Sequence, residues 1–207
     1  MNLCDRNEIQ ELLRRHGFRF SKSMGQNFLI ESWVPEDIAA ASGADRQTGV
    51  LEIGPGIGPL TQQLARRAGK VASVELDRRL YPVLRETMAD FDNFTLLEGD
   101  ATEILHSLTG SYDLIFMDAA KGQYIHFLPD VLRLLAPGGV LLSDNVLQDG
   151  DIIESRFAVE RRNRTIHSRM REYLYALTHT PGITTSVLPM GDGLTLTVKG
   201  EDYEQTT

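Results

Sequence analysis

From residue 49 onward, short apolar runs alternate along the chain with longer amphipathic runs. The apolar runs predict strands at 49–53, 70–76, 94–99, 113–118 and 139–144. The runs between them predict helices at 59–68, 79–90, 101–109 and 124–135. Apolar strands that alternate with helices of this length are typical of an α/β fold, in which a mostly parallel sheet has helices on both faces.

The residues before this region predict two short helices. The first runs from Asp5 to His16, because Asp5 can cap its N-terminus, Glu8 follows three residues later and Gly17 can end it. The second covers 35–42.

The C-terminal part predicts a long helical region and then a hairpin. The helical region spans roughly 151–179. Within 184–200, two strand-like runs flank a Gly-Asp-Gly turn, which favours an antiparallel hairpin. We therefore expect a Rossmann-like, mostly parallel seven-stranded sheet that ends in an antiparallel hairpin.

The composition fits one globular domain, residues 1–207, with 42% hydrophobic and 24% charged residues. We divide it into an N-terminal helical segment (1–48), a first half (49–110), a second half (111–200) and a polar tail (201–207).

The N-terminus and the cysteine content favour a cytoplasmic protein. The first residues are too polar for a signal peptide, and no run approaches about 18 apolar residues, so we expect no membrane partner. Cys4 is the only cysteine, which excludes an internal disulfide.

The charge distribution bears on possible partners. The formal net charge of −8 argues against an obligatory nucleic-acid partner, because phosphate binding requires a basic surface. The stretch 156–171 is nevertheless rich in arginine. It is either a solvated helix face or a surface that binds an acidic substrate or tRNA phosphates.

A glycine-rich loop follows the strand at 49–53. Gly54, Gly56 and Gly58 permit a tight turn and a close approach of a ligand to a helix N-terminus. Their spacing differs from the dinucleotide fingerprint, and the acidic Glu52 precedes them. The alternative is that the loop is only a structural turn.

Acidic residues end the next two strands. Glu75 follows the loop by about twenty residues, where a carboxylate can accept hydrogen bonds from two ribose hydroxyls. Asp100 can accept a hydrogen bond from an exocyclic amine. The glycine loop, Glu75 and Asp100 together therefore describe an adenosine pocket. We extend the expected cofactor contacts to the neighbouring residues Leu76, Gly99 and Ala101 and to the next strand end, Asp118.

These residue types and spacings resemble the S-adenosylmethionine site of class I methyltransferases. Residues from about 5 to 100 further resemble the ribosomal RNA adenine dimethyltransferases, through SKSMGQNFL, VLEIGPGIGPLT and VASVELDRRL. The resemblance implies that Gln26 and Asn27 help to close over the cofactor; the alternative is a polar loop that caps the next helix.

The adenine-methylating activity of that family needs further elements. It requires an Asn-x-Pro-Tyr type motif after the fourth strand to hold a flipped adenine, whereas this sequence has MDAAK there. We also expect its helical RNA-binding domain to have no counterpart in this sequence.

Residues from about 101 to 199 resemble a second family, the metal-dependent O-methyltransferases, which include catechol and caffeoyl-coenzyme A enzymes. The matching segments are YDLIFMDAAKGQY, LAPGGVLLSDNVL and LPMGDGLTLTVK. The chain thus resembles a hybrid of two families that share one fold and one cofactor, with a seam near 99–105.

Two carboxylates at adjoining strand ends predict a metal site. Asp118 and Asp144 close strands that we expect to be neighbours, at the edge where open α/β sheets bind ligands. Such carboxylates repel each other unless a cation or proton lies between them, and Asn145 adds a neutral oxygen. Three hard oxygens suit Mg²⁺, Mn²⁺ or Ca²⁺. The resemblance assigns these three residues as metal ligands.

Lys121 is the predicted catalytic base, and Asp118 is the second predicted catalytic residue. Lys121 lies about one helical turn beyond Asp118 and can accept the proton of a substrate hydroxyl, while a cation stabilises the oxyanion. The alternative is that the aspartates are turn caps and that Lys121 is solvated.

The remaining candidates fall into two groups. Tyr124, Trp33 and Met190 pack in the core or line an aromatic pocket. We interpret His126, His167 and Asp113 as structural or surface residues.

Three functions remain open at this point. The first is an S-adenosylmethionine- and Mg²⁺-dependent O-methyltransferase that acts on a small catechol-like or vicinal hydroxyl compound. The second is an RNA methyltransferase that acts on an rRNA adenine or a tRNA hydroxyuridine. The third is a cofactor-binding protein with little turnover. The O-methyltransferase resemblance also implies a homodimer.

Overall fold

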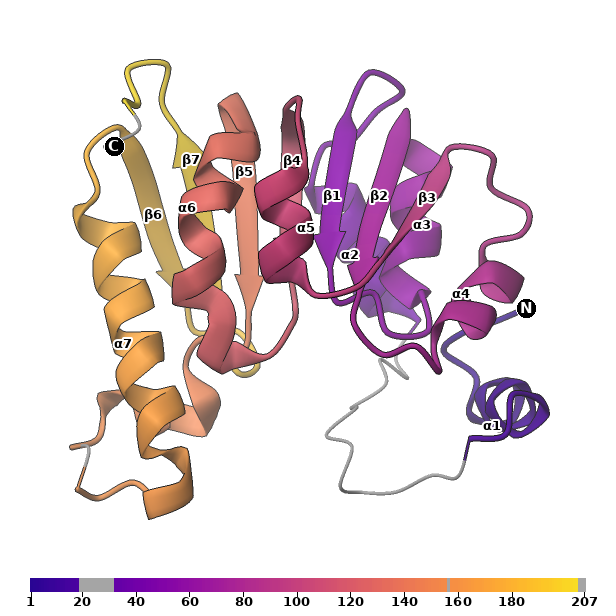
Figure 1. Ribbon diagram of the computed structural model, residues 1–207, viewed down its shortest axis with the longest axis horizontal. Coiled ribbons are helices and arrows are strands. Elements are labelled where there is room, and N and C mark those ends of the chain that lie inside the picture. Colours follow the sequence, from indigo (N-terminus) through magenta and orange to yellow (C-terminus); the bar gives the residue numbers. More distant parts are fainter. Residues whose placement is uncertain (19–31, 156, 205–207) are drawn as a thin grey trace. The chain divides into compact units, whose positions relative to one another are not determined.

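The computed structural model describes residues 1–18, 32–155 and 157–204. These residues form two compact units, Met1–Asp100 and Ala101–Thr207, and the division between them falls within the predicted seam. The seven strands define the expected Rossmann-like methyltransferase fold, a mostly parallel sheet with a C-terminal antiparallel hairpin (Figure 1).

The first unit contains three parallel strands in the order β3-β2-β1. The strands are β1 (Gly49–Ile53), β2 (Lys70–Glu75) and β3 (Phe94–Glu98). Its helices are α1 (Arg6–Arg15), α2 (Trp33–Ala41), α3 (Pro59–Arg67) and α4 (Tyr81–Thr87). Helix α4 is shorter than expected, and α2 begins two residues earlier than expected.

Helix α1 packs on the region of the glycine loop. Its apolar side chains, which include Leu12 and Leu13, form one buried cluster with Ile57 of the loop and with Leu80. The helix begins as predicted, because the Asp5 carboxylate accepts hydrogen bonds from the backbone amides of residues 7 and 8. Helix α1 therefore supports the glycine loop through these apolar contacts.

The second unit contains β4 (Tyr112–Met117), β5 (Leu135–Asp144), β6 (Ile183–Leu188) and β7 (Leu194–Lys199), in the order β4-β5-β7-β6. Strands β4 and β5 are parallel, whereas β7 is antiparallel to both β5 and β6. The helices are α5 (Ala101–Ser107), α6 (Tyr124–Leu134) and α7 (Arg164–His179). In Figure 1, α6 and α7 lie side by side on one face of these strands.

A buried lysine joins α6 to the hairpin. Lys199 at the end of β7 donates hydrogen bonds from Nζ to the carbonyl oxygens of Leu132 (2.8 Å) and Leu135 (2.6 Å). These carbonyls lie at the C-terminal end of α6, where helix carbonyls lack partners within the helix and carry partial negative charge. Lys199 therefore anchors the helix that follows the predicted catalytic turn.

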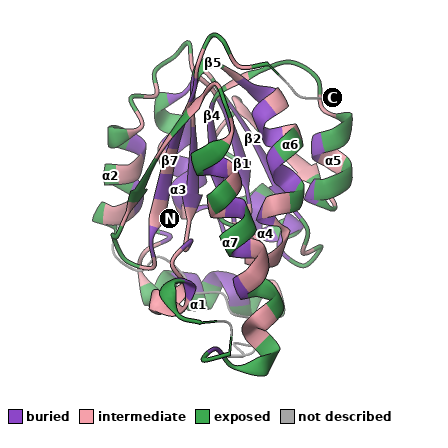
Figure 2. Ribbon diagram, turned by 90° about the vertical axis from the view of Figure 1, so that its left-hand side faces the viewer, coloured by how far each residue is buried: buried purple, intermediate pink, exposed green. Residues whose placement is uncertain are grey.

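The predicted helical region at 151–179 is interrupted. Only α7 is α-helical, and it follows two 3-10 turns, η3 (Gln148–Ile153) and η4 (Arg161–Asn163). Within α7, the residues His167, Met170, Tyr173 and Leu177 are buried and form a stripe along the helix. Figure 2 shows buried and exposed positions alternating along α7. The charged residues before it supply no such stripe, so no continuous helix is stabilised there.

Candidate functional site

The glycine loop between β1 and α3 is held in the left-handed backbone region. The φ angles of Gly54, Gly56 and Gly58 are 90°, 59° and 94°, which other residues rarely adopt. A Cβ at Gly58 would lie 3.3 Å from the Thr87 hydroxyl, so the loop packs tightly on that side. Among the described residues, no atom lies within 4 Å of the position that a Cβ at Gly56 would take, so these residues leave the middle of the loop open to a ligand.

Glu75 lies at the end of β2, beside the middle of the loop. Its carboxylate is almost fully buried and accepts a hydrogen bond from the amide of Asp77 (2.7 Å), with further support from the amides of Gly56 and Leu76. Burial raises the pKa of Glu75. The side chain of Leu76 is 64% exposed, so an apolar surface stands next to a buried acceptor. This pair suits a ligand that carries both a flat ring and hydroxyl groups.

The segment after β3 joins the same edge. The amide of Gly99 donates to the carbonyl oxygen of Glu75 (2.9 Å), and Asp100 follows as an exposed residue. Ala101 is the buried first residue of α5 in the second unit. Gln26 and Asn27, which were predicted to close over the cofactor, lie outside the described residues.

Glu52 has an internal structural role that the sequence did not predict. It is only 2% exposed, and its carboxylate accepts hydrogen bonds from the hydroxyls of Thr61 and Ser73, both at 2.7 Å. The residue thus connects β1, α3 and β2 inside the unit. Its predicted contact with a cofactor stays a prediction.

In the second unit, the register of β4 and β5 brings the two predicted acidic residues together. Met117 pairs with Ser143, and Asp118 and Asp144 are the next residues on the two strands. Although Asp118 is exposed to solvent, protein atoms crowd its carboxyl group, and this desolvation together with the charge of Asp144 raises its pKa to about 6. Burial also raises the pKa of Asp144. The positive charge of Lys121 opposes both shifts.

Lys121 lies on a short 3-10 turn, η2 (Lys121–Gln123), between β4 and α6. Arg169 of α7 donates a hydrogen bond from Nη1 to the carbonyl oxygen of Gly122 (3.1 Å). This contact fixes the turn against α7, so Arg169 holds the backbone on which the predicted base is carried.

Asn145 follows Asp144 in an unusual backbone conformation. Its φ of 57° lies in the left-handed region, and its amide donates to the Asp144 carboxylate (2.7 Å). The next residue, Val146, donates from its amide to the carbonyl oxygen of Gly193 (3.0 Å) in the turn between β6 and β7. A Cβ at Gly193 would lie 2.2 Å from Cγ of Leu147, so only glycine permits this approach. The hairpin therefore holds the residue that follows Asn145, while Asn145 itself occupies a left-handed conformation that asparagine adopts more readily than most residues.

The donor set at these strand ends fits a hard divalent cation. Desolvation and the charge of Asp144 raise the pKa of Asp118 to about 6, a cost that a bound cation would relieve, and oxygen ligands are those preferred by Mg²⁺ and Mn²⁺. Among the described residues, no three His, Cys, Asp or Glu side chains gather as metal ligands. A metal here would need Asn145 and water to complete its shell, so the predicted set of ligands stays a prediction.

The remaining candidate residues divide between the interior and the surface. Tyr124 is fully buried and His167 is 1% exposed, with its Nε2 near the carbonyl oxygen of Glu154 (3.2 Å). Trp33 and Met190 are 60% and 66% exposed, so the expectation that they pack in the core is wrong.

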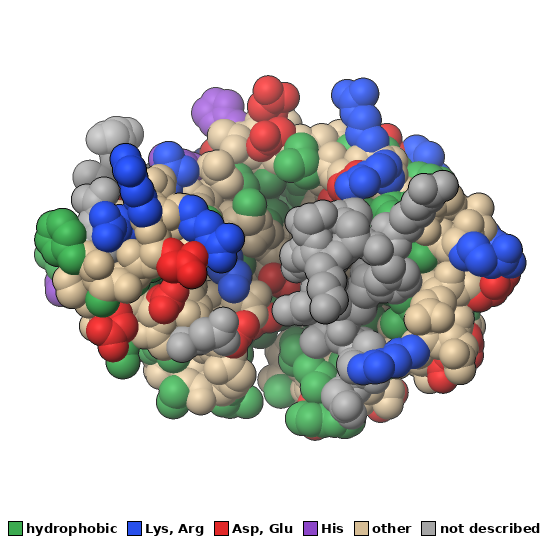
Figure 3. Space-filling model, turned by 90° about the horizontal axis from the view of Figure 1, so that it is seen from below, with side chains coloured by type: hydrophobic (Ala, Val, Ile, Leu, Met, Phe, Trp, Pro, Cys, Tyr) green, Lys and Arg blue, Asp and Glu red, His purple; other side chains and the backbone are tan. Residues whose placement is uncertain are grey.

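The arginine-rich stretch is largely engaged in local contacts. Arg164 donates to the carbonyl oxygens of Val159 and Phe157, and Arg162 forms an ion pair with Glu160 (2.7 Å). On the face seen in Figure 3, Lys and Arg side chains lie on both units, and on the second unit acidic side chains lie close to them. These contacts favour a structural surface over a dedicated anion site.

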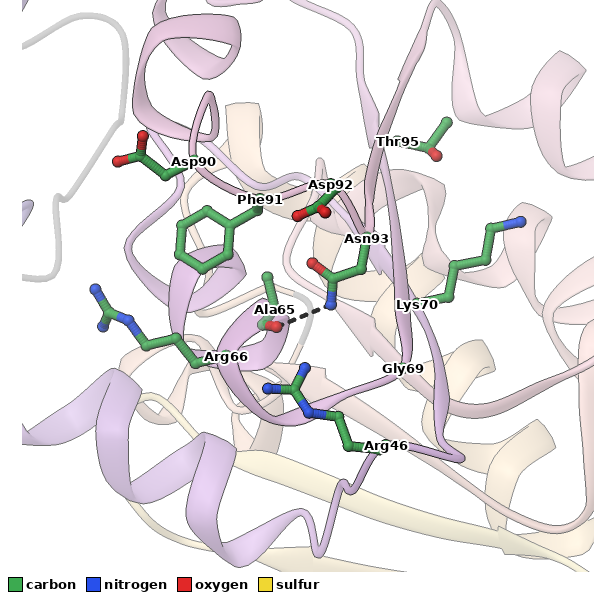
Figure 4. Close-up of a pocket in the computed structure, with 10 residues that line it drawn as sticks. All are labelled: Arg46, Ala65, Arg66, Gly69, Lys70, Asp90, Phe91, Asp92, Asn93 and Thr95. Carbon is green, nitrogen blue, oxygen red and sulfur yellow. Dashed lines mark hydrogen bonds between the residues drawn. The ribbon is translucent and has the colours of Figure 1, made fainter.

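A cavity of about 700 Å³ lies in the first unit, away from the glycine loop. It is lined by residues near the amino ends of β2 and β3, among them Lys70 and Phe91 (Figure 4). Asn93 points into it and donates to the carbonyl oxygens of Ala65 (2.8 Å) and Ala68 (3.0 Å) at the end of α3. None of the predicted site residues lines the cavity. The Asn93 amide, which points into it, is already used to cap the end of α3.

The described part of the chain contains no helix that is both long and apolar enough to cross a membrane.

The fold is that of class I S-adenosylmethionine-dependent methyltransferases. By sequence, residues 17–107 match the family model described as ribosomal RNA adenine dimethylase. A ribosomal RNA small subunit methyltransferase A from Shouchella clausii is 44% identical over 120 residues, which cover 58% of this chain and 39% of that protein. The chain thus spans about two fifths of the length of this relative.

By structure, the chain is similar to a different group of proteins over most of its length. A Klebsiella pneumoniae protein, whose description gives O-methyltransferase as its proposed activity, has a TM-score of 0.73 and 26% identity, over 94% of this chain and 89% of that one. A SAH-bound methyltransferase from Podospora anserina shares the fold, with a TM-score of 0.76 and 22% identity over 95% and 89% of the two chains. The two resemblances expected from the sequence are therefore both confirmed.

Proposed function

We propose that this protein is an S-adenosylmethionine-dependent methyltransferase that uses a divalent cation to methylate a hydroxyl oxygen of a small catechol-like acceptor. The observation that carries the proposal is the pairing of Asp118 and Asp144 at the ends of β4 and β5, with Lys121 acting electrostatically on both.

The first unit supports binding of the methyl donor. The middle of the glycine loop at Gly56 allows a ligand to approach the backbone, Glu75 offers a buried carboxylate to ribose hydroxyls, and exposed Leu76 offers an apolar surface to adenine. S-adenosylmethionine supplies a methyl group on a positively charged sulfur. Several similar structures bind SAH, among them the Podospora anserina protein, and this agrees with the assignment.

In the second unit, three residues would hold the cation, namely Asp118, Asp144 and Asn145. When bound, a hard divalent cation stabilises a developing oxyanion. Lys121 accepts the hydroxyl proton of the acceptor, and the oxygen lone pair then forms the bond to the methyl carbon. The carbon–sulfur bond breaks, its electrons stay on sulfur, and the products are the methyl ether, a neutral thioether and protonated Lys121.

A second candidate function is RNA methylation, which the sequence match of residues 17–107 favours. This candidate lacks support at the end of β4, where the sequence is MDAAK in place of the motif needed to hold a flipped adenine. A third candidate is cofactor binding with little turnover, because the chain joins segments similar to two families.

The three candidates separate in one set of assays. Transfer of labelled methyl from S-adenosylmethionine to a catechol is measured with Mg²⁺ and with EDTA, for the wild type, Asp144→Ala and Asp113→Ala. The proposal expects transfer only with metal, loss in Asp144→Ala, and little change in Asp113→Ala at the opposite end of β4. Binding of SAH, measured by calorimetry, should survive in both variants.

Other results assign the protein differently. Transfer that persists in EDTA or in Asp144→Ala excludes the metal-dependent mechanism. Methylation of rRNA or tRNA fragments, with binding that weakens steeply as salt rises, supports the RNA enzyme. Binding of SAH without product from any acceptor supports the third candidate.

A further inference from the structure

The hydroxyl of Tyr124 lies between the two strand ends that carry the acidic pair. Tyr124 is the first residue of α6 and is fully buried. Its phenol oxygen lies 3.1 Å from the carbonyl oxygen of Met117, 3.1 Å from the carbonyl oxygen of Asp144, and 3.3 Å from the amide of Ala119, which donates to it. One hydroxyl thus contacts the backbone of β4, of the following turn, and of β5.

These three contacts surround the predicted ligands. Met117 and Ala119 are the residues immediately before and after Asp118, and the third contact is the backbone of Asp144 itself. The pairing between β4 and β5 is recorded up to Met117 and Ser143. The Tyr124 hydroxyl therefore connects β4 and β5 just beyond their last paired residues, Met117 and Ser143, where the strands no longer share ladder hydrogen bonds.

We propose that Tyr124 is a positioning residue whose hydroxyl sets the spacing of the Asp118 and Asp144 carboxylates and so determines how tightly they bind a divalent cation. This inference rests on the proposed function. Partners that orient metal ligands commonly change metal affinity by 10- to 100-fold, roughly, when they are removed.

Tyr173 provides a matched comparison for a purely structural tyrosine. It is also fully buried, and its ring contacts that of Tyr124 edge to face, with centroids 5.4 Å apart. Its hydroxyl, however, lies 2.5 Å from Oγ of Ser143 on β5, and within the described part of the chain it makes no hydrogen bond to the backbone of Asp118 or Asp144. Removing either hydroxyl leaves a buried polar group without its partner, but only Tyr124 touches the strand ends.

The test compares Tyr124→Phe with Tyr173→Phe. Binding of Mn²⁺ is measured by electron paramagnetic resonance, in the absence of acceptor, and stability is measured by urea denaturation. We expect similar losses of stability in the two variants. The Kd for Mn²⁺ should rise about tenfold or more in Tyr124→Phe and stay within about twofold of the wild type in Tyr173→Phe. A third variant carries 4-aminophenylalanine at position 124, which keeps a donor and should restore most of the affinity.

Each outcome decides a different point. Mn²⁺ binding by Tyr124→Phe that equals the wild type overturns the positioning role and leaves the proposed function intact. Equal weakening in both phenylalanine variants, or no recovery with 4-aminophenylalanine in a folded protein, also overturns it. A wild type that binds SAH but no Mn²⁺ removes the metal-dependent function, and the positioning role with it.

Discussion

Asp118 and Asp144 end two neighbouring parallel strands, and desolvation together with the negative charge of Asp144 raises the pKa of Asp118 to about 6. The pair therefore stores an electrostatic cost that a cation would relieve. This relationship leads to the first of four predictions.

Without metal, Asp118→Asn should stabilise the protein at pH 7.5 but not at pH 3. The raised pKa means that the folded state holds its proton up to about pH 6, so stability is lost as pH rises from about 4 through 6. The full shift corresponds to about 3 kcal/mol, but solvent screening of the exposed residue reduces this to about 1 kcal/mol. Urea denaturation in EDTA at the two pH values measures the difference. An equal effect at both would show that burial and charge do not penalise Asp118.

Replacement of Lys121 by methionine should separate catalysis from metal binding. Loss of a general base lowers kcat by roughly 10²- to 10⁴-fold. Lys121 places a positive charge near both carboxylates, and this charge repels a second cation, so its removal should leave Mn²⁺ binding unchanged or tighter. Steady-state kinetics and a Mn²⁺ titration test the two parts, with Lys70→Met on the first unit as the control. A normal kcat would remove Lys121 from the mechanism.

The Glu75→Gln variant should weaken SAH binding about tenfold, because the neutral amide accepts hydroxyl hydrogen bonds less strongly than a carboxylate does. Glu98→Gln is the matched control, since Glu98 stands opposite Glu75 in the register of β2 and β3 but is exposed and ion-paired with Arg85. Calorimetric titration with SAH compares the two variants. Equal affinities would contradict the placement of the ribose at Glu75.

Glu52→Ala should destabilise the protein by about 2–4 kcal/mol, since it leaves two buried hydroxyls without their acceptor and opens a cavity. Urea denaturation gives the loss, and SAH affinity is measured on the same sample under folding conditions. Normal stability with lost SAH binding would instead support the direct cofactor contact inferred from the sequence.

The sequence predicts the positions of the strands and of the hairpin turn well, because apolar runs and glycines are local signals. The strand at 49–53 and the hairpin around Gly191–Gly193 occur as expected. The interruption of the helical region at 151–179 was not foreseen, since it depends on which residues find an apolar surface to cover.

The site is only partly predictable for a related reason. The adjacency of Asp118 and Asp144 follows from one rule about parallel strands, and it is found in the structure. The inward orientation of Glu52 and the bridging position of Tyr124 depend on partners 21 and 20 residues away along the chain. Sequence spacing identifies residues such as Glu52 and Tyr124 as candidates, but it does not predict the direction in which their side chains point. Tyr124 is the last residue of the segment YDLIFMDAAKGQY. A tyrosine that is buried at the start of a helix needs a partner for its hydroxyl, and this need is the sequence signal for its role.

The close approach of Gly193 to Leu147 has a consequence for how this protein tolerates mutation. Any side chain at position 193 would push away the segment that carries Asn145, although Gly193 itself needs no contact with metal, cofactor or acceptor. A saturation scan scored by methyl transfer would therefore rank Gly193 with the catalytic residues. Transplanting the candidate site into a related scaffold would require the hairpin turn to be moved together with the strand ends.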